Sequence, residues 1–495
     1  MVAGKFAVAA LSLASVAFAA GHHQVKDADR FERRQAPSVT SRAASATQTR
    51  TGGGGGGGSQ VASSPLASLT RIGTTTTSAA TVALPTTFTA GASPPISGAP
   101  PLPAITALNP ANYPALDVTP PIDSPEVQQW IKDADLANAP NIPPTGLNGC
   151  SNSTNAEALS KAGADGNCWW TCGGCTRATD ITYCPTTEEF GLSYDDGPSP
   201  DTPRLLNLLA ANDIKSTFFI VGSRAISRPE MLQTEYMSSH ALSVHTWAHP
   251  PLTTLSNEQI VAELGWTKKI IKDVTGVTPN TMRPPYGDID DRVRYIAMKM
   301  GLRPIIWTSY NGKEFDTQDW QIGAGVVNAT TVYNNFENIL GMAPSMPHGF
   351  IVLAHDLYQQ SVDLAVNYIL PQIISAGQLK LQPISQCLGE PLSNAYIETS
   401  DNKTALIQSS STVVGASGTG FVSFAASTSS GSSSASTGSS APSSSTSSAS
   451  GSGSGSSTGN NSSGGSQPTS AANSVAVASG IVGAVIVASS LLVLA

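Results

Sequence analysis

The sequence predicts an α/β domain in which short parallel strands alternate with helices. Between about residues 186 and 385, apolar runs of strand length alternate with segments of helical periodicity. Polar residues that could carry chemistry follow directly after several of these runs. Repeated βα units imply a parallel sheet, either closed as a barrel or open and doubly wound, and a barrel places its chemistry at the C-terminal strand ends.

Five apolar runs are the predicted strands: EFGLSYD (189–195), STFFIVG (216–222), ALSVH (241–245), RPIIWTS (303–309) and GFIVLAH (349–355). Helices are expected to open at Pro203 and to span 256–276, 290–300, 330–340 and 362–376. The helix at 256–276 has the clearest signals, because Ser256 and Gln259 form a capping-box pattern and Gly276 can close the helix. These elements supply the alternation that a parallel sheet needs.

Composition argues against a core in the rest of the 495-residue chain. Residues 35–145 are rich in Pro, Thr, Ser and Ala, and residues 405–470 are almost wholly Ser, Gly, Thr and Ala. Both tracts are expected to be disordered, because they bury too little apolar surface to offset their ordering entropy. The remaining residues, about 240, suffice for one large domain.

The expected division is a signal peptide at 1–19, a low-complexity Pro/Thr/Ser-rich segment at 20–145, a Cys-rich lead-in at 146–185, the α/β domain at 186–385, its C-terminal extension at 386–404, a Ser/Gly-rich stalk at 405–465 and a propeptide at 466–495. The net charge of −8, with 26 Lys plus Arg and no basic cluster, argues against a nucleic-acid partner.

Both ends of the chain carry predicted targeting signals. Residues 1–20 place one Lys before an apolar run that ends in Ala-Phe-Ala, which is typical of a secretory signal peptide. Residues 474–495 are apolar to the last residue and have no basic flank, and small residues lie upstream at the spacing of a GPI signal. The attachment candidates are Asn461, Ser462, Ser463, Gly464 and Gly465. We therefore expect a secreted protein held on the outer leaflet of the plasma membrane by a GPI anchor and in the cell wall, with a transmembrane tail as the alternative.

Cysteines and sequons agree with export. The six cysteines predict up to three disulfides of undetermined pairing, although the run CWWTCGGC could instead hold structural zinc. Trp169 and Trp170 in that run could offer a sugar-stacking surface, but we favour buried packing beside the cysteines. Candidate glycosylation sites are Asn152, Asn328, Asn402, Asn460 and Asn461.

Four chemically capable residues follow predicted strands: Asp195, Asp196, His245 and His355. In HTWAH, His245 and His249 stand four apart, a spacing that puts two imidazoles on one face of a helical turn. With one strand-end carboxylate they form a two-His, one-carboxylate set that leaves coordination positions open for water and substrate. The pair Asp195–Asp196 can share this site if the chain turns there, as Gly197 and Pro198 permit, so that one carboxylate binds metal and the other acts as a base.

The motifs SYDDGP, HTWAH, RPPYG, DTQDW and LAH occur in this order within about residues 186–385. Together they resemble the five motifs of the NodB-homology polysaccharide deacetylases, carbohydrate esterase family four. The secreted, Ser-rich frame with its GPI signal is similar to that of fungal chitin deacetylases. Tyr194 stands where the family more often has Phe, and we expect its ring to pack behind the aspartate pair.

The resemblance implies a distorted, incomplete (β/α) barrel and a role for each motif residue. Asp195 matches the catalytic base and Asp196 a metal ligand beside His245 and His249. Arg283 matches the residue that orients the base, His355 the general acid and Asp319 the carboxylate that tunes the acid. Tyr286, Trp320 and Leu353 match substrate-binding positions.

The implied activity is metal-dependent removal of N-acetyl groups from chitin, which yields chitosan and acetate. One divalent ion is expected, with zinc as first candidate, cobalt as second, and nickel or manganese as further fits. Chitin and, through the anchor, the membrane are the expected partners, and cell-wall glucan is a further candidate. Two rivals remain: a wall-bound, carbohydrate-binding mannoprotein without activity, and a deacetylase of another polymer such as peptidoglycan or xylan.

Overall fold

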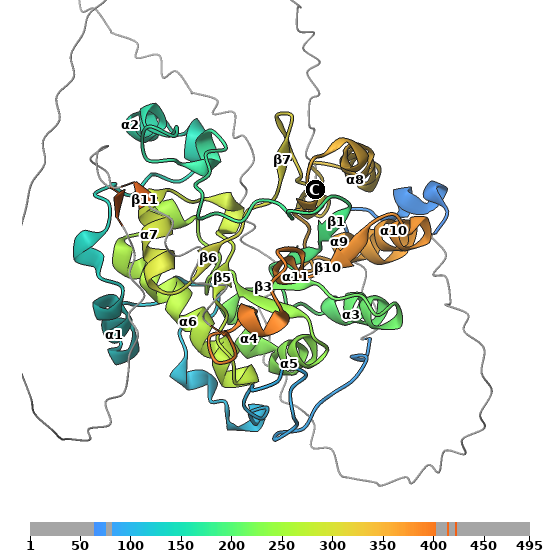
Figure 1. Cartoon of the computed structure of the whole chain (residues 1–495), viewed down its shortest axis with the longest axis horizontal. Helices are drawn as coiled ribbons and strands as arrows, with labels where there is room; N and C mark the ends of the chain where they lie inside the picture. The colour runs from blue at the N-terminus through green and yellow to red at the C-terminus, as the bar shows by residue number, and fades with distance from the viewer. Residues whose placement is uncertain (1–63, 76–81, 402–412, 415–420, 423–495) are drawn as a thin grey trace, which may run out of the picture. The chain divides into compact units, whose positions relative to one another are not determined.

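The computed structural model describes residues 64–75, 82–401, 413–414 and 421–422 (Figure 1). The predicted signal peptide and GPI signal lie outside these residues, as do Asn402, Asn460 and Asn461. Of the predicted stalk, the structure describes only 413–414 and 421–422. Within the described residues, no helix combines the length and apolar character that a membrane crossing requires. The short strands β11 (Val413–Val414) and β12 (Phe421–Val422) pair antiparallel with each other.

Two parallel sheets form the centre of the domain. The larger sheet has the order β2 (Ser193–Asp195), β3 (Thr217–Ile220), β4 (Ala241–Val244), β5 (Thr281–Met282) and β6 (Arg303–Pro304). The smaller has the order β10 (Lys380–Gln382), β1 (Glu189–Gly191) and β9 (Phe350–Ile351). A parallel bridge between Asp195 and His355 joins the two sheets. In the larger sheet the strands follow one another in sequence order, without the reversal of a doubly wound sheet. The described strands do not close into a full circle, so the predicted distorted, incomplete barrel is confirmed.

Three of the predicted strands differ in detail from the structure. The run 189–195 divides at Leu192 into β1 and β2, which belong to different sheets. The run 303–309 leaves the sheet after Pro304, and its end forms a hairpin of β7 (Ser309–Tyr310) with β8 (Lys313–Glu314). In the run 349–355 the regular strand is limited to β9. The two-residue strands β5 and β6 are too short to give a period-2 pattern.

Helices cover the strands largely where the sequence predicts them: α3 (Thr202–Ala211), α6 (Asn257–Thr275), α7 (Asp291–Lys299), α8 (Ala329–Met342), α9 (Gln359–Leu364) and α10 (Leu370–Ala376). The capping box at Ser256 and Gln259 and the left-handed Gly276 are both present on α6. A π-helical turn at Ala365–Ile369 links α9 to α10, so the predicted last helix is not one regular α-helix. The sequence analysis missed α4 (Gly222–Ser227), α5 (Pro229–Met237) and α11 (Ile384–Cys387).

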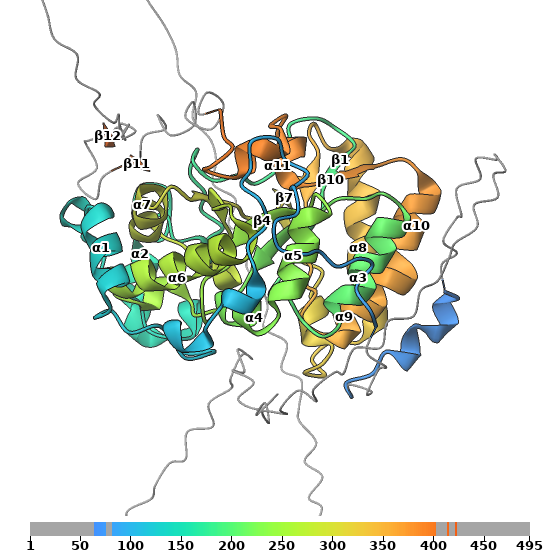
Figure 2. The same ribbon diagram turned by 90° about the horizontal axis from the view of Figure 1, so that it is seen from below.

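The prediction that residues 35–145 lack packed structure is wrong for the part that the structure describes. Helix α1 (Pro125–Asp133) lies along α6 (Figure 2). Trp130 meets Trp266 edge to face at 5.4 Å between ring centroids. Ile96 and Leu102 are also buried in the main core. The segment needs no core of its own, because its widely spaced apolar residues bury themselves against the α/β domain.

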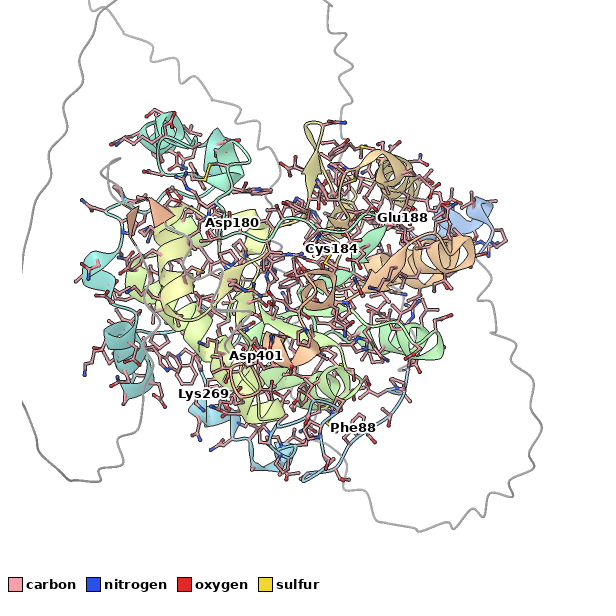
Figure 3. All side chains as sticks on the ribbon, viewed as in Figure 1. Phe88, Asp180, Cys184, Glu188, Lys269 and Asp401 are labelled. Carbon is pink, nitrogen blue, oxygen red and sulfur yellow. A yellow bond between two sulfur atoms is a disulfide. The ribbon has the colours of Figure 1, made fainter. Side chains whose placement is uncertain are left out.

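The Cys-rich lead-in contains α2 (Ala156–Ser160) and is fastened by disulfides. The pairs are Cys150–Cys172, Cys168–Cys175 and Cys184–Cys387, and none of the six cysteines is free. The zinc alternative for CWWTCGGC is therefore wrong. Cys184, labelled in Figure 3, ties the start of the domain to α11. Trp169 and Trp170 are 2% and 8% exposed, which confirms buried packing.

We expect Gly265→Ala to lower the free energy of unfolding by about 1–3 kcal/mol. A helical Gly→Ala change normally stabilises, by about 1 kcal/mol. Here a Cβ at Gly265 would collide with the Trp130 ring of α1. The matched control is Gly341→Ala in α8, where a Cβ meets nothing within 4 Å. Urea unfolding of both variants checks the prediction, and a gain of stability in Gly265→Ala would contradict it.

Candidate active site and metal centre

The two adjacent aspartates stand at the C-terminal end of β2. Asp195 is the last strand residue, and Asp196 has a φ of 78°, so the chain turns at Asp196 itself rather than only at Gly197 and Pro198. On a regular strand the two side chains would point to opposite faces. The left-handed turn brings both toward the same buried region, where Asp195 is 1% and Asp196 is 6% exposed.

The HTWAH segment is a loop after β4 and not the predicted helical turn. Thr246 and His249 have φ values of 64° and 61°, which no α-helix contains. The buried Glu263 of α6 holds the loop, because one of its oxygens accepts from the amides of Trp247 (2.8 Å) and Ala248 (2.9 Å). Burial raises the pKa of Glu263 to about 7, although the amide donors oppose this. The two imidazoles therefore meet through loop geometry.

Asp196, His245 and His249 form a group that could hold one metal ion, with candidate ligand atoms all within 4.8 Å of one another. The Nε2 atoms of His245 and His249 lie 3.3 Å and 3.0 Å from Asp196 Oδ1. The Arg283 carbonyl, which can only accept, lies 2.7 Å from His245 Nδ1, so Nδ1 carries the hydrogen and Nε2 is free to bind metal. Burial lowers the pKa of His249 and favours the neutral imidazole that a metal needs.

Arg283 and Asp195 form a buried ion pair beside this group. Arg283 Nη1 donates to Asp195 Oδ1 at 2.6 Å and to Ser193 Oγ at 3.2 Å, and the guanidinium is fully buried. The Asp195 Oδ2 atom lies 3.9 Å from His245 Nε2. The pairing orients the carboxylate so that one oxygen remains directed to the candidate metal centre.

His355 and Asp319 make a second buried pair at the same strand ends. His355 Nδ1 lies 2.7 Å from Asp319 Oδ1, and the His355 amide donates to Asp319 Oδ2 at 2.9 Å. Burial disfavours the imidazolium, but the charge and hydrogen bond of Asp319 outweigh this and raise the pKa of His355 to about 10. The imidazole is therefore set to hold a proton near neutral pH.

The three predicted substrate positions differ in how far the structure supports them. Tyr286 is 42% exposed, and its ring meets the His249 ring edge to face at 4.7 Å, so it borders the candidate centre. Trp320 is half-buried, and its amide donates to Asp319 Oδ1. Leu353 is buried, and its carbonyl accepts from Thr317 Oγ1 at 3.0 Å. Nothing in these contacts directs the Leu353 side chain toward the centre.

Several supporting residues escaped the sequence analysis. Arg224 of α4 donates to the Asp196 carbonyl at 2.7 Å and so supports the turn at Asp196. Asp356 lies against Gly197, where a Cβ would collide with its carboxylate, which explains the glycine of DDGP. Burial raises the pKa of Asp356 to about 7, although a bond from Thr202 opposes this. Nothing in the sequence around Arg224 indicates that its partner is the backbone carbonyl of Asp196, 28 residues away.

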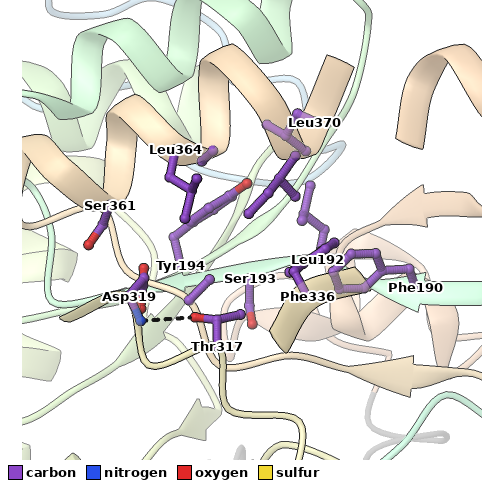
Figure 4. Close-up of a pocket in the computed structure, with 13 residues that line it drawn as sticks. Phe190, Leu192, Ser193, Tyr194, Thr317, Asp319, Phe336, Ser361, Leu364 and Leu370 are labelled. Atoms are coloured by element: carbon purple, nitrogen blue, oxygen red, sulfur yellow. Dashed lines mark hydrogen bonds between the residues drawn. The ribbon is translucent and has the colours of Figure 1, made fainter. Parts of the chain in front are cut away.

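A small cavity lies beside Ser193 and Tyr194, the two residues of β2 that precede the aspartate pair in sequence (Figure 4). It is lined by Tyr194 of β2, by Asp319 of the 3-10 turn Asp319–Gln321, and by Leu364 of α9 and Leu370 of α10. Tyr194 is buried and stacks on Phe218 with ring centroids 5.9 Å apart. The ring is therefore packed in the core, and its position behind the aspartate pair stays a prediction.

A carboxylate pair, two imidazoles and a buried imidazole–carboxylate pair at one end of a parallel barrel are suited to hydrolysis of an unreactive carbonyl compound. Sequence comparison identifies the family within that class. The polysaccharide deacetylase family model matches residues 183–305. Chitin deacetylase 1 of Cryptococcus neoformans var. grubii is 60% identical over 329 residues, covering 66% of this chain and 68% of that protein. The chain belongs to the polysaccharide deacetylase family and is a hydrolase.

Other relatives match a smaller share of this chain. The chitin deacetylase of Amylomyces rouxii is 34% identical, with 56% of this chain and 64% of that protein covered. The peptidoglycan-N-acetylglucosamine deacetylase PgdA of Listeria monocytogenes is 31% identical, with 46% and 45% covered. The solved chitin deacetylase of Colletotrichum lindemuthianum is 27% identical with a TM-score of 0.40, covering 45% of this chain and 97% of that one.

We expect Asp319→Asn to move the alkaline limb of the kcat/KM profile to lower pH. The Asp319 charge raises the pKa of His355, so its removal lets the imidazolium lose its proton at lower pH. If the protonated form is the active one, activity is retained below this pKa and lost as pH rises through it. Measurement of kcat/KM across about pH 6–11, a range that includes the usual pKa of histidine, checks this. Metal content is the control. An unmoved limb with metal still bound would show that Asp319 does not tune His355.

Proposed function

We propose that the protein hydrolyses the N-acetyl groups of chitin and leaves chitosan and acetate. The 60% identity to a fungal chitin deacetylase carries the choice of substrate. Support for the reaction comes from one buried region that holds Asp195 with Arg283, His355 with Asp319, and the candidate metal group Asp196, His245 and His249.

The donor set fits one divalent ion. Two imidazoles and one carboxylate are ligands that zinc and cobalt accept. Three protein ligands leave coordination positions open for water and substrate. When bound, the ion would supply Lewis-acid polarisation of the acetamide carbonyl and stabilise negative charge on its oxygen. Zinc is our first candidate and cobalt our second.

The protein's own residues move the protons. Asp195, held by Arg283 on Oδ1, is the base that takes a proton as water attacks the carbonyl carbon. His355 is the acid that donates its proton to the departing amine, and Asp319 keeps it charged until then. One water is consumed, the C–N bond breaks, and acetate and a glucosamine unit leave. Tyr286 and Trp320 are proposed to contact the sugar, and Leu353 the acetyl methyl.

Two rivals lead to different observations. An inactive, carbohydrate-binding mannoprotein has no need for a base, an acid and their two orienting partners in one buried region. Another polymer as substrate is a closer rival, because a Listeria peptidoglycan deacetylase is also a relative. Acetate release from chitin oligomers, peptidoglycan and acetylxylan separates these possibilities.

We expect a chelator to abolish acetate release from chitin oligomers and zinc or cobalt to restore it. Asp196→Ala should lose bound metal, because it removes the carboxylate of the candidate group. Asp195→Asn should keep metal and lose turnover by roughly 10²- to 10⁴-fold, the usual range for a general base. Metal analysis and kinetics on the same preparations check both. Full activity in a metal-free preparation would contradict the proposal.

We further propose that the mature protein is a secreted glycoprotein, lipid-anchored through GPI to the outer leaflet and present in the cell wall. The sequence supports this through the apolar end, the polar spacer and the small residues 461–465. Asn328 is exposed and Asn152 half-buried, which leaves both candidates for glycans. Cell-wall glucan remains a candidate partner.

Phosphatidylinositol-specific phospholipase is expected to release the protein from intact membranes. Carbonate at high pH, which leaves membrane-embedded proteins in place, serves as the control treatment. Recovery of a peptide from residues 474–495 in the mature protein would contradict a GPI anchor.

A further inference from the structure

Asp288 lies directly after the RPPYG motif, and no role has been assigned to it so far. Its side chain is buried, with 4% of the residue exposed. Oδ1 accepts from Trp169 Nε1 at 2.8 Å and from Thr171 Oγ1 at 2.6 Å. Oδ2 accepts from the Thr253 amide at 2.8 Å and hydroxyl at 2.7 Å. One carboxylate therefore joins two segments that are distant in sequence.

The first segment belongs to the Cys-rich lead-in and lies outside the family-matched residues 183–305. The disulfides Cys150–Cys172 and Cys168–Cys175 bracket it. The Trp170 amide also donates to the Ile289 carbonyl at 2.9 Å. The lead-in thus contacts this loop through two side chains at Asp288 and one backbone hydrogen bond at Ile289.

The second segment leads back to the candidate metal centre. Thr253 follows His249 by four residues, and Asp288 follows Tyr286 by two. Tyr286 and Gly287 have φ values of 61° and 66°, so the loop has an uncommon backbone conformation. A Cβ on Gly287 would collide with the Trp170 ring, which shows how closely the lead-in packs on this loop.

We propose that Asp288 is a positioning residue that sets the spacing between His249 and Tyr286 by fastening both of their loops to the lead-in. The inference rests on the proposed function, because the acetamide must sit between the candidate metal centre and the Tyr286 loop. A misplacement of about 1 Å at such a site can cost about 10²-fold in rate. The disulfide-fastened lead-in is then part of the catalytic unit.

The test uses the full secreted chain and changes the two lead-in donors and the Asp288 acceptor in separate variants. Thr171→Val keeps the shape of the side chain and removes its hydroxyl, Trp169→Phe removes the indole donor, and Asp288→Asn weakens all four bonds. We expect kcat/KM on chitin oligomers to fall by roughly 10- to 100-fold. Metal content and both limbs of the pH profile should stay unchanged, because Asp195 and His355 are not altered. Thr171→Ser, which retains the donor, should recover most of the lost activity.

Amide hydrogen exchange gives a second measurement that does not depend on activity. Exchange should rise in peptides covering 250–255 and 284–290 of Thr171→Val. Thr399→Val is the matched control, because it removes another part-buried hydroxyl that donates elsewhere, to the Ser393 carbonyl. It should show neither change.

The outcomes separate the two proposals. The positioning role would be overturned if Thr171→Val and Trp169→Phe kept the wild-type kcat and the wild-type amide exchange. It would also be overturned if these variants had a lower Tm but unchanged kinetics at temperatures below that Tm. If the wild-type chain released no acetate from chitin oligomers, the proposed function would fail. Exchange at 250–255 and 284–290 would then still decide whether Asp288 fastens the two loops.

Discussion

The site depends on one buried guanidinium. Arg283 lies fully inside the barrel, donates to Asp195 and stacks its guanidinium carbon 3.9 Å from the Phe219 ring centroid. Its backbone carbonyl also faces His245 Nδ1. A single residue thereby orients the carboxylate that we propose as base and sets the tautomer of a proposed metal ligand. Removing one member of such a buried pair costs about 3–5 kcal/mol, because an unpaired charge is left behind. The geometry of both functional groups is therefore coupled to the stability of the fold.

The parallel strand ends collect more negative charge than a buried region tolerates alone. Asp195, Asp196 and Asp319 lie at this end, each at most 6% exposed. Arg283 and Arg224 offset part of that charge directly. These carboxylates, Asp319 foremost, also raise the pKa of His355 to about 10 although burial opposes this. In the mechanism that we propose, the crowding that keeps a proton on His355 is the same crowding that a divalent ion would relieve. Metal affinity and acid strength at this site are linked through these carboxylates.

The sequence predicted the alternation of strands and helices, the ends of α6 and the set of groups that meet at the strand ends. These features rest on local patterns, namely apolar periodicity, capping residues and ordered motifs. It did not predict the division of β1 from β2 at Leu192, because sheet exchange depends on partners far away in sequence. It expected HTWAH to form a helical turn, whereas Glu263, sixteen residues from Trp247, holds it as a loop. Composition also misjudged residues 82–145, since it measures whether a segment can build its own core and not whether it can cover another one.

The short strands explain why distant chain segments matter to the site. β5 contains two residues, so the RPPYG loop that follows it receives little support from sheet hydrogen bonds. Support comes from outside the family-matched residues instead. Trp169 and Thr171 donate to Asp288 beside the RPPYG loop. The HTWAH loop after β4 also has a partner outside these residues, because the Trp247 indole donates to the Ala115 carbonyl at 2.9 Å. A fragment that began at residue 183 would keep every motif residue and lose these partners. Buried donors and acceptors left unpaired in this way cost about 1–3 kcal/mol each. The folded enzyme is therefore larger than its motif-bearing domain, and its loops take their shape from a segment that composition alone presents as a linker.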